Sequence, residues 1–252
     1  MSYISSKIKV EKYMDDNGKL IGFIQGKVIP MIHSSYPISM EIAGNYAMWT
    51  RPDTGDSPSS YPAPTYSGVK GIFESILWGE AIEVIPRKVE ICKPIVYHSY
   101  AFNYTGPLRK ASNIRKGTNY QAFQTVLIDV CYKLYADVVP YRGKNELPER
   151  AKAWDHKTTS PGHAYKAIFE RRLKRGQCFS IPFLGLKEFT PTYFGPIREE
   201  TKVVEDMPDI TIPSMLREVF SHGYNSIVDY VYDTNLIIHK GVLQYPERKN
   251  NR

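Results

Sequence analysis

The order of helix-like and strand-like segments is the feature that most constrains the fold of this 252-residue chain. Apolar residues recur at helical spacing in 65–78 and again in 163–175. Strand-like runs, rich in Val, Ile and Tyr, surround both segments, at 36–44, 81–102, 126–138 and 178–189. Polar residues predict loops at 103–123 and 140–162. This order predicts an α+β, ferredoxin-like (RRM-like) βαββαβ domain over residues 36–190.

The ends of the chain lie outside this pattern. Residues 1–35 are predicted to form an N-terminal extension, and the Asn17-Gly18 pair between two apolar runs indicates a β-hairpin there. Residues 191–252 hold short runs rich in Ile, Val and Tyr. They are predicted to form a small C-terminal antiparallel β region.

The first predicted helix contains both a start signal and an unfavourable residue. Thr65 or Ser67 can supply the oxygen of the N-cap. Gly71 lies inside the helix, where glycine costs about 1 kcal/mol relative to alanine. We expect close packing of the helix backbone to offset this cost, and Gly71→Val is therefore expected to disrupt folding.

The composition is that of a globular protein with a basic surface. Hydrophobic residues make up 42% of the chain and the net charge is +7, which favours polyanionic partners. No apolar run approaches the roughly 20 residues of a membrane span, and no signal core follows the N-terminus, so a cytoplasmic protein is expected. The three cysteines, Cys92, Cys131 and Cys178, form no CxxC pair, and no two histidines show HxxxH spacing. We therefore predict reduced thiols, no metal and no cofactor.

Basic and aromatic residues gather in the segment from Ile91 to Ile128, which contains no Asp or Glu. Its candidate RNA-binding residues are Arg109, Lys110, Arg115, Lys116 and Tyr120, beside Lys93 and further aromatic residues. Cations neutralise phosphates and aromatic rings stack on unpaired bases, so the segment is a candidate RNA clamp. A solvated loop with aromatic residues in the core explains the same pattern, and the residues alone leave both interpretations open.

Two further groups of residues are candidates for binding or cleaving RNA. Arg171, Arg172, Lys174 and Arg175 lie at the end of the second predicted helix, where they suit either RNA or the helix dipole. His156 and His163 share a polar segment with Lys157 and Lys166. Metal-independent RNA cleavage needs a base, an acid and a cation, and these residue types supply all three.

Three sequence blocks resemble a known family. They are GNYAMWTRP at 44–52, SYPAPTYSGVKGIFESILW at 60–78 and RRLKRGQCFSIPFLGLKEF at 171–189. In order and spacing they are similar to the signature of the CRISPR-associated Cas-five family, subtype d, of type I-C systems. The resemblance covers residues 36–190.

The resemblance implies a RAMP-type ferredoxin-like domain in a Cascade surveillance complex. Members of the family bind the 5′ handle of the guide RNA (crRNA) and meet target DNA through the complex. Their neighbours are the backbone Cas-seven subunits and the large Cas-eight subunit. In type I-C systems the protein usually also cuts the repeat RNA, without metal, by means of a Tyr, a Lys and a His.

At those three catalytic positions this chain carries Leu77, Ala164 and Tyr165. Since none of these transfers protons readily at neutral pH, we expect an RNA-binding subunit that leaves cleavage to a separate Cas-six type nuclease. The alternative is an active endoribonuclease whose candidate residues are His163 or His156, Lys166, and Tyr165 or Tyr46. An extended lead-in would place His163 on the side of Tyr165, whereas a helix would separate them. A ferredoxin-like interaction module unrelated to RNA is a third possibility.

Overall fold

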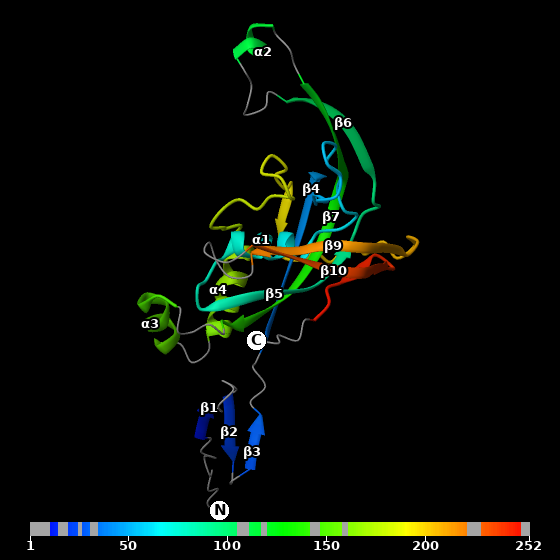
Figure 1. Cartoon of the computed structure of the whole chain (residues 1–252). Coiled ribbons are helices and arrows are strands. Elements are labelled where there is room, and N and C mark those ends of the chain that lie inside the picture. Colours follow the sequence, from blue (N-terminus) through cyan, green and yellow to red (C-terminus); the bar gives the residue numbers. More distant parts are fainter. Residues whose placement is uncertain are drawn as a thin grey trace, which may run out of the picture. The chain divides into compact units, whose positions relative to one another are not determined.

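The computed structural model describes residues 11–14, 20–24, 27–30, 35–104, 111–116, 120–141, 147–157, 161–220 and 228–247. The chain divides into two compact units, residues 1–35 and residues 36–252 (Figure 1). Each unit has its own sheet and is described separately below.

The first unit is a small antiparallel sheet. Its strands are β1 (Glu11–Met14), β2 (Leu20–Ile24) and β3 (Lys27–Pro30), in the order β1-β2-β3. Glu11 lies opposite Phe23, and Met14 lies opposite Leu20. The Asn17-Gly18 pair lies outside the described residues, and β3 is a strand that the sequence pattern did not predict.

The second unit is built on one eight-stranded sheet, which is antiparallel throughout. Its strands are β4 (Tyr36–Ala47), β5 (Ile82–Ile91), β6 (Tyr97–Tyr104), β7 (Tyr120–Pro140), β8 (Tyr193–Gly195), β9 (Ile210–Phe220), β10 (Val228–His239) and β11 (Val242–Gln244). The order across the sheet is β8-β4-β7-β5-β11-β10-β9, and β6 also pairs with β7. The fold is therefore a mixed α/β structure on a curled antiparallel sheet (Figure 1).

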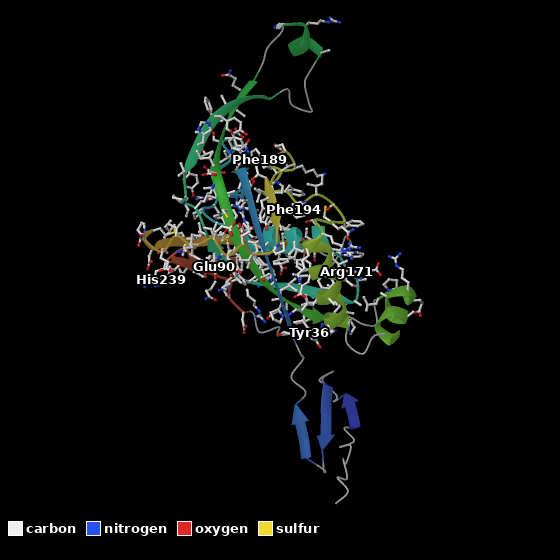
Figure 2. All side chains as sticks on the ribbon, turned by 180° about the vertical axis from the view of Figure 1, so that it is seen from behind. Tyr36, Glu90, Arg171, Phe189, Phe194 and His239 are labelled. Atoms are coloured by element: carbon white, nitrogen blue, oxygen red, sulfur yellow. The ribbon has the colours of Figure 1, made fainter. Side chains whose placement is uncertain are left out.

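The residues after position 190 complete this sheet. β8 pairs with β4, with Phe194 opposite Ile42 (Figure 2). β11 pairs with β5, with Val242 opposite Glu90. The strands of 191–252 are thus antiparallel but do not form a separate region, because they cover strand edges that would otherwise carry unpaired backbone groups.

The described residues of this unit include four helices: α1 (Tyr66–Ile76), α2 (Ala111–Arg115), α3 (Glu149–Lys157) and α4 (Pro161–Lys174). α1 and α4 pack on the same face, where the rings of Phe73 and Phe169 lie 5.6 Å apart. The predicted start of α1 is confirmed, because the Thr65 side chain accepts a hydrogen bond from the Gly68 amide at 3.1 Å. In the described part of the chain, no helix has the length and apolar character needed to cross a membrane.

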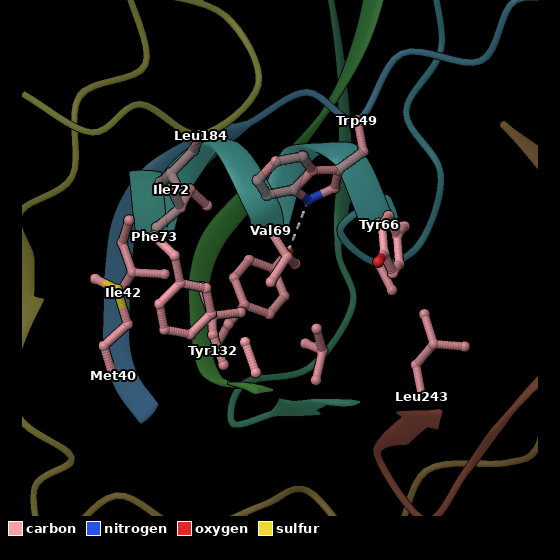
Figure 3. Packing of buried hydrophobic residues seen from close by; sticks show 14 of the residues in the cluster. Met40, Ile42, Trp49, Tyr66, Val69, Ile72, Phe73, Tyr132, Leu184 and Leu243 are labelled. Carbon is pink, nitrogen blue, oxygen red and sulfur yellow. Dashed lines mark hydrogen bonds between the residues drawn. The ribbon is translucent and has the colours of Figure 1, made fainter. Parts of the chain in front are cut away.

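The main core lies between these two helices and the sheet. From Ile38 to Gly44 every second residue of β4 is buried, including Met40 and Ile42 (Figure 3). The indole of Trp49 donates a hydrogen bond to the hydroxyl of Tyr132 at 3.4 Å, so that both polar atoms are satisfied inside the core.

β7 bends at Asp129, whose φ of 51° is in the left-handed region. Before the bend β7 pairs with β6, up to Leu127 opposite Tyr97, and after it β7 pairs with β5. Asp129 itself forms an ion pair with Lys93, which lies between β5 and β6. We call β6, α2 and residues 120–128 the arm, which extends from the rest of the sheet with α2 at its far end (Figure 1).

Three parts of the predicted pattern were wrong. Residues 178–189 form no strand, because their backbone binds the end of α1: the amides of Phe179 and Ser180 both donate to the Ser75 carbonyl, at 2.9 and 3.0 Å. The next strand along the chain is the short β8, which pairs with β4. The loop predicted at 140–162 contains α3, and the one predicted at 103–123 contains α2 and the ends of β6 and β7.

The packing predicted for Gly71 was also wrong. Gly71 is exposed, and a Cβ atom added there meets no atom within 4 Å. The glycine therefore only weakens the helix. We expect Gly71→Ala to raise the free energy of unfolding by roughly 0.5–1 kcal/mol in urea denaturation. A lower stability of this variant would show that Gly71 makes a contact that the structure lacks.

Candidate nucleic-acid interface

Side chains of α4 bind the carbonyl groups at the end of α1. The last carbonyls of a helix have no partner within the helix and need donors from elsewhere. Arg172 Nη1 donates to the Ile76 carbonyl at 3.1 Å, and the Tyr165 hydroxyl donates to the Leu77 carbonyl. Two positions far apart in the sequence, 77 and 165, are therefore in direct contact.

This contact joins two of the three positions at which the resemblance expects catalytic residues. Tyr165 is only 2% exposed, and burial, with the nearby charge of Glu74, raises its pKa far above the ordinary value of a tyrosine. The phenol therefore stays protonated and is engaged with the Leu77 carbonyl. Ala164, the neighbouring position, carries no titratable group. The three side chains provide neither a base nor an acid at neutral pH.

A mostly apolar pocket of about 410 Å³ opens beside this contact, between the end of α1, α3 and α4. Trp78, 53% exposed, forms part of its wall. At its edge Arg150 Nε donates to Glu80 at 3.3 Å, so the carboxylate there is paired. The lining of the pocket can accommodate an aromatic ring or another apolar group. Its titratable side chains are engaged in the contacts described above, so none of them is placed to transfer a proton.

His163 and Lys166 lie on other faces of α4. Because the helix begins at Pro161, His163 is helical and exposed, and its ring meets Tyr36 at 5.8 Å. A step of two residues in a helix turns the chain by about 200°, so His163 faces away from the buried Tyr165. Lys166 lies 3.8 Å from Glu170, one turn along the helix.

Two members of the alternative catalytic set, Tyr46 and His163, lie far apart. Tyr46 lies at the other end of β4 from Tyr36, and ten strand residues span roughly 33 Å. Its ring instead packs 5.8 Å from that of Phe189. His156 lies in α3. The arrangement contradicts a joint site of His163 and Tyr46.

The arm carries the exposed part of the acid-free segment. Arg115, at the end of α2, and Lys116 are both exposed. Tyr120 begins β7 opposite Tyr104, whereas Arg109 and Lys110 lie outside the described residues. Two aromatic rings of the arm are also exposed, Tyr97 (45%) and Phe123 (55%). Cations and open aromatic faces on one hairpin are what a site for single-stranded nucleic acid requires.

Comparison with known proteins identifies the family. A family model for Cas5d, described as a CRISPR-associated protein (Cas5), matches residues 38–240. The chain belongs to the Cas5d family. A CRISPR pre-crRNA endoribonuclease Cas5d of Mannheimia succiniciproducens is 31% identical over 207 residues, which cover 74% of this chain and 86% of that protein.

One further relative agrees with this assignment, and one solved structure shares the fold. A CRISPR pre-crRNA endoribonuclease Cas5d of Thermus thermophilus is 31% identical over 160 residues, and the match spans 63% of this chain and 63% of that protein. A solved structure described as a CRISPR-associated protein has the same fold, with a TM-score of 0.62 at 19% identity over 86% of this chain and 94% of its own.

The basic cluster at the end of α4 divides into two kinds of residue in this Cas5d family member. Arg171 (Figure 2), Lys174 and Arg175 are exposed and available to a polyanion. Arg172 is partly buried and donates to the Ile76 carbonyl, so at least one of its donors stabilises the end of α1. No local pattern indicates this difference, because the acceptor lies in a helix about a hundred positions earlier in the chain.

Sequence reasoning also missed the exposed apolar residues that follow this cluster. Phe179, Ile181 and Phe183 are 77%, 66% and 39% exposed, whereas Pro182 and Leu184 between and beyond them are buried. Their alternation was present in the sequence but was interpreted as a strand with one face in the core. Exposed apolar residues at this density are typical of a surface that binds a partner.

The two neighbouring arginines allow a matched test. We expect Arg172→Ala to lower the free energy of unfolding by about 1–2 kcal/mol, because it leaves a helix-terminal carbonyl without its charged donor. Arg171→Ala should change stability by less than about 0.5 kcal/mol, as is usual for an exposed residue. Urea denaturation of both variants measures the difference, and equal stabilities would contradict the structural role of Arg172.

Proposed function

We propose that this Cas5d family member binds the 5′ handle of crRNA as a subunit of a CRISPR surveillance complex and does not cut the repeat RNA itself. The observation that carries the proposal is the contact between Tyr165 and Leu77. Where the resemblance expects a Tyr, a Lys and a His, this chain has a buried phenol bound to a backbone carbonyl beside a mostly apolar pocket.

The fold supports this proposal. We infer that β4, α1, β5, β7, α4 and β8 form the ferredoxin-like βαββαβ motif of RAMP proteins. Their order across the sheet, β8-β4-β7-β5, is that of a split βαβ pair, in which the first and third strands are central. The arm is then an insertion between the second and third strands of the motif.

The surface supports the RNA-binding half of the proposal. The net charge of +7 favours a polyanion. On the arm, Arg115 and Lys116 present exposed positive charges, and Tyr97 and Phe123 present exposed rings on which bases can stack. Partners by the same resemblance are the Cas-seven and Cas-eight subunits, with target DNA reached through the complex. A separate Cas-six type nuclease would supply the matured crRNA.

A metal-independent endoribonuclease is the second candidate function. It is favoured by the names of both relatives that are 31% identical, since each is described as a pre-crRNA endoribonuclease. Such an activity would have to use His163 and Lys166, which are exposed or partly exposed on α4. It would have to do so without the buried Tyr165.

We expect no specific cleavage of the cognate repeat RNA by the isolated protein, with magnesium or with a chelator. General acid–base catalysis supplies about 10²- to 10⁴-fold for each positioned group, and the aligned positions supply none. The measurement is a denaturing gel of labelled repeat RNA, with a gel shift on the same sample to prove that the RNA is bound. A discrete product ending in a 2′,3′-cyclic phosphate, lost in His163→Ala, would establish the endoribonuclease instead.

A further inference from the structure

Two of the three cysteines face each other at the base of the arm. The pairing of β5 with β7 places Ile91 opposite Tyr132, and one step further the Cys92 amide donates to the Cys131 carbonyl at 2.9 Å. Residues directly opposite on antiparallel strands have Cα atoms about 4.5–5.5 Å apart, with side chains on the same face. This separation lies within the range that a disulfide bond spans.

The two thiols differ in exposure. Cys131 is 4% exposed, and its sulfur lies 3.6 Å from Glu41 Oε1, to which it donates. Cys92 is partly exposed at the end of β5. The pKa of Cys92 is lowered, first by the neighbouring Cys131 side chain and then by the charge of Lys133, whereas Cys92, burial and Glu41 raise the pKa of Cys131. Cys92 is therefore the thiol that ionises first and that a reagent in solution reaches first.

We propose that Cys92 and Cys131 form a redox-active dithiol, which small disulfides such as oxidised glutathione convert into a cross-strand disulfide. The proposal is independent of the function assigned above. It also departs from the reduced, inert thiols that the sequence predicts.

The reaction follows thiol–disulfide exchange. The Cys92 thiolate attacks one sulfur of the oxidant, which forms a mixed disulfide and releases one small thiolate. Cys131 then loses its proton and attacks the Cys92 sulfur, which closes the protein disulfide and releases the second small thiolate. The two protons of the protein thiols end on two small thiols, and the two electrons lost by the protein reduce the oxidant.

The residues around the two cysteines can accommodate a disulfide bond, and the position of this bond would link it to the arm. Glu41 loses the Cys131 donor but keeps hydrogen bonds from Arg198 Nε and Thr201 Oγ, both at 2.9 Å. Cys131 lies two positions after the bend at Asp129, and Cys92 precedes Lys93, which pairs with Asp129. A covalent bond here would tie together the two strands from which the arm begins.

The test is oxidation of the fully reduced, full-length protein with oxidised glutathione, followed by peptide mapping without reductant. We expect a Cys92–Cys131 cross-link and an intact mass lower by two hydrogen atoms. Cys131→Ser should stop at the first step and carry one glutathione on Cys92. Cys92→Ser should leave Cys131 unmodified, and Cys178→Ser should still form the cross-link.

Other products would overturn the proposal. The contradicting outcomes are a stable mixed disulfide of glutathione with Cys92 in the wild-type protein, a cross-link that includes Cys178, and no modification of Cys92 and Cys131. Because Cys131 is buried, its serine variant is checked for folding by circular dichroism. If Cys131→Ser does not fold, peptide mapping of the wild-type protein and of Cys178→Ser still tests whether the Cys92–Cys131 cross-link forms.

Discussion

Gly185→Ala is expected to lower the free energy of unfolding by about 3–5 kcal/mol, enough to leave little folded protein. The residue has a φ of +93°, which alanine rarely adopts, and a Cβ atom there would lie 1.8 Å from the Met48 carbonyl oxygen. The obstacle is backbone and not a side chain that can rotate. The Met48 amide also donates to the Leu184 carbonyl at 2.9 Å, so the two segments cannot separate without losing that bond.

Gly55→Ala is the matched control for this variant. Gly55 also has a positive φ, +57°, but no atom lies within 4 Å of the position of an added Cβ. Its substitution carries only the conformational cost, about 1–2 kcal/mol. Denaturation in urea measures both variants. Equal losses would mean that the close approach of Gly185 to Met48 is absent in solution.

Alanine at Arg109, Lys110, Arg115 and Lys116 together is expected to produce the largest change in RNA binding. Each lost phosphate contact on a single strand lowers the slope of log affinity against log salt by about 0.7, so the four together should lower it by about 3. The measurement is a titration of the repeat RNA at several salt concentrations. The fold should be unaffected, because Arg115 and Lys116 are exposed at the tip of the arm.

A smaller pair of variants isolates the described part of the arm. Arg115→Ala with Lys116→Ala should lower the slope by about 1.4. Lys202→Ala with Lys240→Ala removes the same charge from exposed positions away from the arm and should leave the slope nearly unchanged. If the two pairs of substitutions lower the slope equally, RNA binding depends on net charge alone and not on the arm. Absence of any RNA binding by the wild-type protein would favour the interaction module unrelated to RNA.

Local signals in the sequence predicted the helices that build the core. The spacing of apolar residues and the side chain of Thr65 were sufficient for α1, because both act within one helix. The strand predicted at 178–189 was wrong because the structure of this segment depends on a contact with a distant part of the chain. Alternation predicts a strand only if a neighbouring strand is available, and here the backbone of Phe179 and Ser180 binds the end of α1.

The candidate site was predictable in part. The motif alignment pointed to positions 77 and 165, and the structure places them in contact. The commitment of Arg172 to a carbonyl, and the distance between His163 and Tyr46, depend on tertiary structure that no local pattern contains. The face-to-face arrangement of Cys92 and Cys131 likewise depends on the register between β5 and β7.

The pairing of β11 with β5 also sets the time at which the protein can finish folding during synthesis. β5 ends at Ile91, but its neighbour β11 begins only at Val242. Tyr245, whose hydroxyl donates to the Pro64 carbonyl at 2.7 Å, arrives later still. Until Val242 has left the ribosome, β5 has an open edge that can pair with other nascent chains. Such long-range pairings also slow folding, so the demand for chaperones should be greatest in the interval between the synthesis of β5 and that of β11.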